Sequence, residues 1–78
     1  MRFMVIETFL PGCREQVYAR FGEKGRMLPD GLRFVERWLE KDGDRCVQLM
    51  ETDRPELFAV WTENWKDIIS FEIIPVES

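Results

Sequence analysis

The sequence predicts an α+β fold, in which two helices cover one face of a four-stranded antiparallel sheet. The first observation is the order of the segments: stretches rich in β-forming residues alternate with two stretches of helical apolar spacing, giving strand, helix, strand, strand, helix, strand. The second is the Asp-Gly pair inside residues 41–44, which is a strong hairpin signal between the two middle strands. Right-handed crossovers then join both halves into one sheet, so we expect a single domain over residues 1–78.

The first half of the chain supplies a strand and a helix. Residues 2–9 (RFMVIETF) are rich in β-forming residues and end before Pro11-Gly12, as a strand followed by a turn does. A helix of about three turns follows. Its apolar residues at helical spacing are Cys13, Val17, Tyr18 and Phe21, and Gly22 and Gly25 are its stop signals. The next loop carries Met27 and Leu28, which we expect to pack against the core.

The central hairpin joins a strand over residues 32–40 to a strand over residues 45–52. With Asp42 and Gly43 as the loop, the predicted cross-strand pairs are Glu40 with Arg45, Trp38 with Val47, and Phe34 with Glu51. The stretch RFVERW (residues 33–38) is unusual for a half-buried strand, because both of its faces mix apolar and charged side chains. We expect this strand to lie between two surfaces that are each incompletely buried.

The chain ends with a second helix and a fourth strand. Asp53 and Glu56 have the spacing of a capping box, which predicts that the helix starts at this point. Its predicted apolar face combines Leu57, Trp61, Trp65 and Ile68 with Phe58 and Val60. Residues 68–76 (IISFEIIPV) complete the sheet, with Pro75 on an edge or at a strand end because it has no N–H to donate.

Both faces of the predicted sheet are apolar in their middle, which two helices on one side do not explain. In the first strand Phe3, Val5 and Phe9 oppose Met4 and Ile6, and the third and fourth strands show the same pattern. Such a face exceeds what soluble monomers expose, so we expect a second copy of the chain to cover it, sheet against sheet. Polar residues that interrupt these faces are expected at the rim or around a cavity; they are Glu7, Glu36, Arg37, Gln48, Glu51 and Glu72.

The charge pattern narrows the classes of partner. Lys and Arg total 11 against 15 Asp and Glu, the net charge is -4, and no basic stripe occurs, which argues against nucleic acid and against an anionic membrane surface. No apolar run approaches the roughly 20 residues that cross a bilayer. The first ten residues lack the cleavage site of a signal peptide, so we expect a cytoplasmic protein.

The chain also lacks the residues that most cofactor sites use. It contains no histidine, which removes the commonest metal ligand, general base and proximal haem ligand. Cys13 and Cys46 lack the spacing of a zinc or redox motif, and buried apolar side chains are preferred over a disulfide or a nucleophile. We therefore expect no metal and no cofactor.

Short motifs spread over the whole chain carry a resemblance to a known family. They are FMV in the first strand, Arg37-Trp38, Glu51-Thr52, Trp61 and Trp65 with Asp67, and IIPV near the end. The chain resembles a small family of bacterial domains of unknown function that is similar to the dimeric α+β-barrel superfamily. The resemblance implies a ferredoxin-like βαββαβ sandwich that forms a homodimer. That superfamily includes cofactor-free monooxygenases, small isomerases, haem enzymes and ligand-sensing modules, and the missing histidine departs from its haem-binding branch.

One cluster is a candidate ligand site; it comprises Arg37, Trp38, Glu51, Trp61, Asn64 and Trp65. Indoles, an arginine and a carboxylate between the sheet and the second helix suit a planar aromatic or acidic small molecule, whose carboxylate Arg37 can bind through two hydrogen bonds. Glu51 is the candidate catalytic base if burial raises its pKa towards neutrality. In the predicted register Arg37 points away from Trp38 and Glu51, so convergence requires a bulge or a partner subunit.

The candidate residues other than Trp38 also have a purely structural interpretation. Trp61 and Trp65 lie at helical spacing, as core residues do. Glu51 is close to the positive end of the second helix, and Arg37 can pair with an acidic neighbour at a rim. Asn64 is expected to face water or to help close the helix.

Two functions follow from these alternatives. The first is a homodimeric module that binds a small aromatic or acidic molecule, or converts it without a cofactor as a monooxygenase or isomerase does. The second is a structural or regulatory dimerisation module whose aromatic residues are core. The sequence leaves the enzyme question open, and it pairs no nucleophile with a base as a Ser or Cys triad requires.

Overall fold

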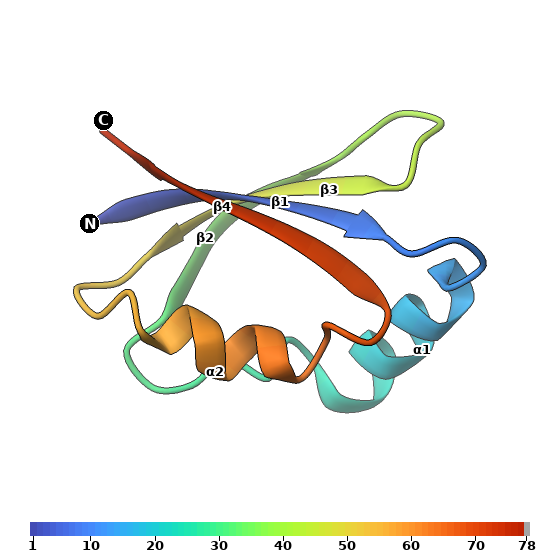
Figure 1. The fold of residues 1–78 in the computed structure, drawn as a ribbon, viewed down its shortest axis with the longest axis horizontal. Coiled ribbons are helices and arrows are strands. Elements are labelled where there is room, and N and C mark those ends of the chain that lie inside the picture. The colour runs from blue at the N-terminus through green and yellow to red at the C-terminus, as the bar shows by residue number, and fades with distance from the viewer. Residues whose placement is uncertain (78) are drawn as a thin grey trace.

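The structure is a computed structural model that describes residues 1–77. Its elements in chain order are β1 (Arg2–Phe9), α1 (Arg14–Lys24), β2 (Arg33–Leu39), β3 (Arg45–Glu51), α2 (Leu57–Glu63) and β4 (Ile69–Val76). The strands form one antiparallel sheet in the order β2-β3-β1-β4. Both helices lie on the same side of this sheet (Figure 1). The expected ferredoxin-like α+β fold is confirmed.

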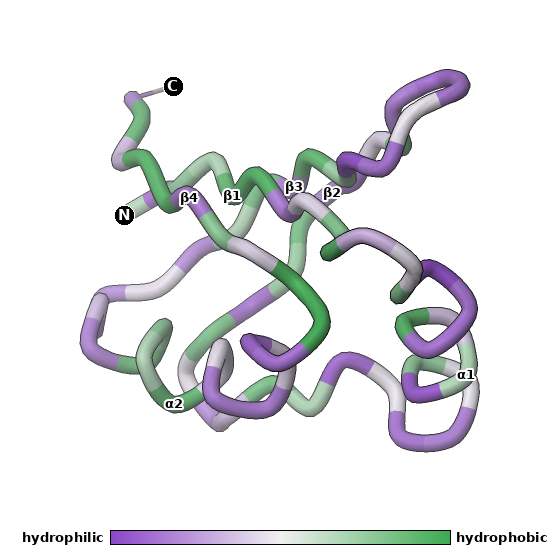
Figure 2. The backbone as a smooth tube through the Cα atoms, turned by 45° about the vertical axis from the view of Figure 1, so that its right-hand side comes forward, coloured by the Kyte–Doolittle hydropathy of each residue, from purple (hydrophilic) through white to green (hydrophobic). Residues whose placement is uncertain are grey.

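The alternation of β1, a central strand, defines the two faces of the sheet. Phe3, Val5, Glu7 and Phe9 are buried on the face that the helices cover, which we call the inner face. The residues between them lie on the opposite, outer face. The inner face forms the core together with residues from both helices. Figure 2 shows hydrophobic residues along the strands, and hydrophilic residues at the turn of the β2–β3 hairpin and on parts of α1 and α2.

The β2–β3 hairpin forms as expected near its turn and differs further along. Trp38 pairs with Val47, and the backbone N–H of Glu40 donates to the carbonyl of Arg45 at 2.8 Å. Phe34, however, pairs with Met50, so the expected pairing with Glu51 is wrong. The register shifts between Phe34 and Glu36 because the ladder contains one extra residue in β2, which is a β-bulge.

This bulge resolves the mixed pattern of RFVERW. On the turn side of the bulge, Arg37 pairs with Gln48 and therefore lies on the inner face, whereas Glu36 and Trp38 lie on the outer face. Phe34 lies on the inner face as well, because the extra residue reverses the alternation at that point. A single strand thus sends an aromatic and an arginine inward from positions that simple alternation would place on opposite faces.

α1 packs against the sheet through a narrow stripe. Val17 is its buried residue, whereas Tyr18 and Phe21 are partly exposed. The expected packing of Met27 and Leu28 against the core is confirmed. Arg20 fixes the helix to the end of α2, since its guanidinium donates to both carboxylate oxygens of Asp67 at 2.8 and 2.9 Å and lies over the Trp65 ring.

α2 is shorter than the sequence predicts, and its start differs. The expected capping box is wrong, because the helix starts at Leu57 without a side-chain cap and the exposed Asp53 pairs with the N-terminal amine at 3.4 Å. The Thr52 hydroxyl instead accepts a hydrogen bond from the Arg54 N–H at 3.0 Å and forms a local turn. The apolar face is confirmed except at Val60, which is 54% exposed; its buried members are Leu57, Phe58, Trp61, Trp65 and Ile68.

The outer face carries apolar side chains that no helix of the described residues covers. Pairing places Met4 and Ile6 of β1 on this face opposite Leu49 and Val47 of β3. Trp38 of β2, which is 52% exposed, extends the same surface. The expectation that both faces are apolar is confirmed.

Among residues 1–77, no helix has the length and hydrophobicity that crossing a bilayer requires.

Candidate functional site

A cavity of about 90 Å³ lies between the inner face and α1. Its apolar wall is mainly aromatic and consists of Phe9, Tyr18, Phe21, Trp61 and Trp65. Its polar lining consists of Glu7, Arg26, Arg37 and Gln48. Tyr18, Phe21, Arg37 and Leu39 line it and are exposed to solvent, so the cavity opens between α1 and β2. We call this cavity the inner pocket.

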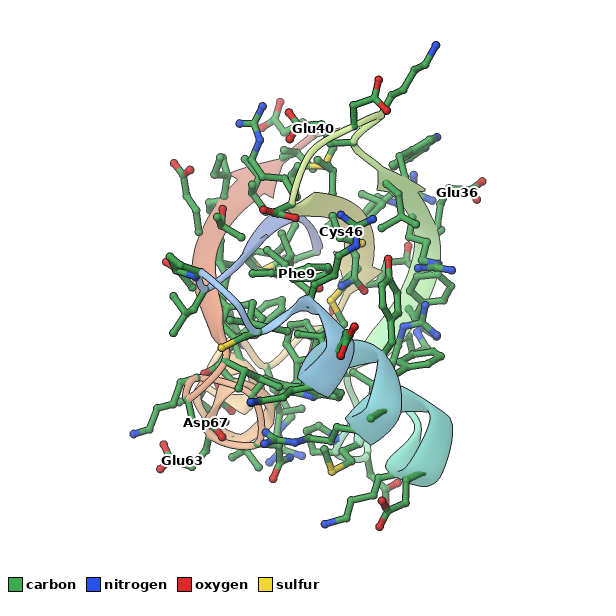
Figure 3. The ribbon with its side chains drawn as sticks, turned by 90° about the vertical axis from the view of Figure 1, so that its right-hand side faces the viewer. Phe9, Glu36, Glu40, Cys46, Glu63 and Asp67 are labelled. Atoms are coloured by element: carbon green, nitrogen blue, oxygen red, sulfur yellow. The ribbon has the colours of Figure 1, made fainter. Side chains whose placement is uncertain are left out.

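Glu7 is the buried acid of the inner pocket. It sits on β1 between Val5 and Phe9, paired with Cys46 of β3 and Phe71 of β4, and is only 7% exposed. Figure 3 shows Phe9 and Cys46, which flank this position, in the interior beside α1 and Glu36 pointing away from the sheet. Burial raises the pKa of the Glu7 carboxyl to about 7, an effect that a hydrogen bond from Gln48 opposes most strongly, followed by the charges of Arg26 and Arg37.

Two arginines face this carboxyl from different elements. Arg37 reaches the pocket from β2, and Arg26 reaches it from the loop after α1. Burial lowers the pKa of Arg26, and the nearby charge of Arg37 lowers it further. Within residues 1–77, neither guanidinium lies within 4.0 Å of a carboxylate oxygen. The pocket therefore contains two cationic groups that this part of the chain does not pair with an acid.

The chain holds Arg26 in place through its backbone and through aromatic contacts. The indole N–H groups of Trp61 and Trp65 both donate to its carbonyl oxygen, at 3.0 and 3.1 Å. Its guanidinium lies 3.6 Å from the centroid of the Phe34 ring and 5.1 Å from that of Phe21, in the range of cation–π contacts. The two tryptophans of the pocket wall thus hold the backbone of the half-buried Arg26, while Phe34 and Phe21 contact its guanidinium.

Gln48 completes the polar lining from β3, directly opposite Arg37 of β2 and Val5 of β1. The residue is 4% exposed, and its Oε1 atom is buried without a hydrogen-bond partner among the described residues. Burial also raises the pKa of the neighbouring Cys46 thiol, and the charge of Glu7 raises it further. This thiol is thus protonated at neutral pH, which leaves Glu7 as the group of the pocket that titrates there.

The structure brings together half of the residues that the sequence singles out. Arg37, Trp61 and Trp65 line the inner pocket. Trp38 lies on the outer face, and Asn64 lies exposed after α2, where its side-chain amide donates to the Met27 carbonyl at 3.5 Å. The bulge in β2 does not bring Trp38 to the side of Arg37.

Glu51 lies on the outer face, away from the pocket. Its carboxylate accepts hydrogen bonds from Arg2 at 3.0 Å and from Arg33 at 3.2 Å. The hydrogen bond with Arg2 is the main reason that the pKa of Glu51 is lowered. The expectation that burial raises this pKa towards neutrality is wrong, because the carboxylate is paired and partly solvated instead of being desolvated alone.

Sequence reasoning does not select Glu7, Gln48 and Arg26 as site residues, although a signal exists for two of them. Glu7 interrupts the inward series Phe3, Val5 and Phe9, and Gln48 stands at an inward position of β3. Both belong to the set that we expect at a rim or around a cavity, and both border the cavity. Arg26 gives no such signal, because it lies in a loop that has no periodicity.

Comparison with protein-family models assigns the chain to a known family. Residues 1–78 match DUF3303, a domain of unknown function, over their whole length. The chain belongs to the DUF3303 family. No curated protein and no solved structure matches it. The inner pocket is therefore a candidate site for this DUF3303 domain on the evidence of its own geometry.

Proposed function

We propose that the inner pocket binds a small organic acid and that Glu7 exchanges a proton with this ligand. The observation that carries the proposal is the convergence of three groups on one open cavity. They are a buried carboxyl whose pKa is about 7 and two arginines that have no carboxylate partner among residues 1–77.

The charge balance of the pocket favours an anion. Two arginines face at most one negative charge, that of Glu7, so the pocket stays cationic whether Glu7 is ionised or not. A guanidinium binds a carboxylate through two parallel hydrogen bonds, and this pairing is strongest where water is partly excluded. The aromatic wall supplies a flat apolar surface for the rest of the ligand.

Glu7 is suited to move a proton at neutral pH. A general acid or base is most effective when its pKa lies near the working pH. A bound carboxylate would raise the pKa of Glu7 further, because it adds a negative charge nearby and neutralises the arginines. The higher pKa makes the Glu7 carboxylate a stronger base. In an isomerisation without a cofactor, ionised Glu7 would take a proton from one position of the ligand and return the same proton at another position.

Titration of the protein with phenylacetate tests the binding site. The fluorescence of Trp61 and Trp65 should change as the pocket fills, since both indoles line it. Arg37→Met should weaken binding at least about tenfold, because a charge-assisted hydrogen bond contributes roughly 1.5–3 kcal/mol. Arg54→Met is the matched control, as Arg54 lies outside the pocket and is exposed, and it should leave the affinity unchanged. Equal affinities of the two variants would contradict the proposal.

A separate observation favours a dimerisation function. The outer face presents Met4, Ile6, Trp38, Val47 and Leu49 as one apolar surface that the helices leave uncovered. We propose that a second copy covers this surface, as in the dimeric α+β barrels that the sequence resembles. Such a dimer is compatible with ligand binding, and it would be the whole function if the pocket stays empty.

Sedimentation velocity at micromolar concentration tests the dimer. The wild-type protein should sediment at twice the chain mass of 9.4 kDa. Leu49→Glu should return it to the monomer, because a charge in the middle of the apolar interface would lose its hydration. Val60→Glu makes the same change on the exposed side of α2 and should leave the dimer intact. A wild-type monomer would rule the dimer out.

The two free cysteines bear on the cellular compartment of the protein. Cys13 and Cys46 are free, with Cys46 buried and Cys13 half-buried. Free thiols are typical of proteins in reducing compartments. We therefore propose that the protein is cytoplasmic.

A further inference from the structure

The unpartnered oxygen of Gln48 indicates that the ligand of the inner pocket carries a hydrogen-bond donor in addition to the negative charge that the arginines favour. Gln48 is 4% exposed, and its Oε1 atom is buried without a donor among the described residues. A buried acceptor that loses water and gains no donor destabilises the folded state, so nearly all such atoms in native proteins have a partner. Gln48 lines the inner pocket, and a molecule in this pocket can supply the missing donor.

Neither arginine of the pocket donates to this oxygen, and ionised Glu7 has no hydrogen to give because it accepts a hydrogen bond from the Gln48 side chain instead. Arg37 is the cross-strand neighbour of Gln48, yet no hydrogen bond links the two side chains among those described. Arg26 is held between the rings of Phe34 and Phe21. While Glu7 is ionised, the donor therefore comes from the occupant of the pocket.

A plain carboxylate cannot provide this donor. Its oxygens accept hydrogen bonds from Arg26 and Arg37, but an ionised carboxyl group has no hydrogen to give to Gln48. A hydroxyl group on the same molecule has one. A ligand that satisfies the pocket thus carries two functional groups, an anionic group opposite the arginines and a hydroxyl opposite Gln48.

We infer that the ligand is a small hydroxycarboxylic acid whose carboxylate binds between Arg26 and Arg37 and whose hydroxyl donates to Oε1 of Gln48. This inference rests on the proposed function and deepens it. The cavity of about 90 Å³ is smaller than the roughly 300–1,000 Å³ of drug-sized sites. It encloses the carboxylate and hydroxyl end of such an acid, and a ring attached to that end contacts Tyr18 and Phe21 at the opening.

Matched pairs of acids that differ by one hydroxyl test the inference. Mandelate is compared with phenylacetate, and glycolate with acetate, by calorimetric or NMR titration of the wild-type protein at constant pH. The hydroxylated member of each pair should bind about tenfold more tightly, because it satisfies the buried acceptor that its partner leaves alone. Equal affinities within each pair overturn the inference.

Gln48→Met removes the acceptor at nearly constant side-chain volume. In this variant mandelate and phenylacetate should bind with about the same affinity, because mandelate loses its advantage while the affinity for phenylacetate stays unchanged. Gln16→Met is the matched control, because Gln16 lies exposed on α1, and it should keep the preference. A preference that persists in Gln48→Met overturns the inference, and the wild-type comparison decides the matter if this variant does not fold.

The outcomes separate this inference from the proposed function. If both acids of a pair bind equally and Arg37→Met weakens both, the anion site stands and the hydroxyl contact is wrong. If neither acid binds at millimolar concentration, the anion site and the hydroxyl contact are both wrong.

Discussion

Carboxylates on the two faces of the sheet differ in pairing, burial and pKa. On the outer face, the carboxylate of Glu51 is held by Arg2 and Arg33, and its pKa is lowered. On the inner face, Glu7 is buried, has no cation within salt-bridge distance among the described residues, and its pKa rises to about 7. The same type of residue on the same sheet is thus a paired surface ion in one place and a neutral-pH acid in the other.

Pairing and burial distinguish a carboxylate with a structural role from one with a functional role. A paired, solvated carboxylate adds little to stability and has no proton to offer near pH 7. A buried carboxyl beside unpaired arginines is unfavourable for the fold alone, and such arrangements are concentrated at functional sites. The outer face differs in its apolar residues as well, because these remain uncovered while those of the inner face form the core.

The largest expected effect comes from a comparison of two tryptophans, one on each face. Trp61 is 1% exposed, contacts the rings of Phe58 and Phe71, and donates to the Arg26 carbonyl. Trp61→Ala should lower the free energy of unfolding by roughly 3–5 kcal/mol, as measured by urea denaturation. Trp38→Ala on the outer face should change it by no more than about 0.5 kcal/mol when both tryptophan variants are made in the Leu49→Glu background, which we expect to be monomeric. Similar losses for both variants in that background would show that Trp38 is buried within the single chain.

The next largest effect is the pH dependence that Glu7 imposes. Its pKa is 4.5 in the unfolded chain and about 7 in the folded protein, so between these values the folded state binds more protons than the unfolded state. The stability must therefore fall as the pH rises through this window and stay level above it. A shift of this size corresponds to about 3 kcal/mol. Urea denaturation at pH 5 and pH 8 measures the loss.

Glu7→Gln is the variant that isolates this effect. Without a titrating group at position 7, the decline between pH 5 and pH 8 should disappear, and the variant should be more stable than the wild-type protein at pH 8. The pKa values of Glu40, Glu51 and Asp67 are lowered by their arginine partners, so these groups do not titrate in the same window. A decline that survives in Glu7→Gln would show that Glu7 is solvated or paired in solution.

The smallest effect is expected at Glu51, which sequence reasoning selects as the catalytic base. Glu51→Gln should leave the affinity for phenylacetate unchanged, because the carboxylate lies on the outer face. The same substitution at Glu7 should change this affinity and its pH dependence. Fluorescence titration of both variants makes the comparison, and an effect confined to Glu51→Gln would transfer the proposed site from the inner face to the outer face.

Much of the fold could be predicted from the sequence, because local signals specify its elements. The alternation in residues 2–9 and the Asp-Gly turn place the strands correctly, and the apolar spacing from Leu57 to Ile68 identifies the face of α2. The errors arise where two local signals compete. Asp53 and Glu56 match a capping box, but the Thr52 turn delays the helix, and one extra residue in β2 alters the pairing of Phe34.

The sequence by itself determined the order of the elements, the apolar character of both sheet faces and the inward position of Trp61 in α2 and of Trp65 just after it. These features follow from periodicity and turn residues, which are local properties of a few neighbouring positions. Only the tertiary structure decided that Glu7, Gln48, Arg26 and Arg37 meet around one cavity, since they come from three strands and a loop. It also decided which carboxylates have partners. Burial and pairing are properties of the assembled chain, and they set the pKa values that separate Glu7 from Glu51.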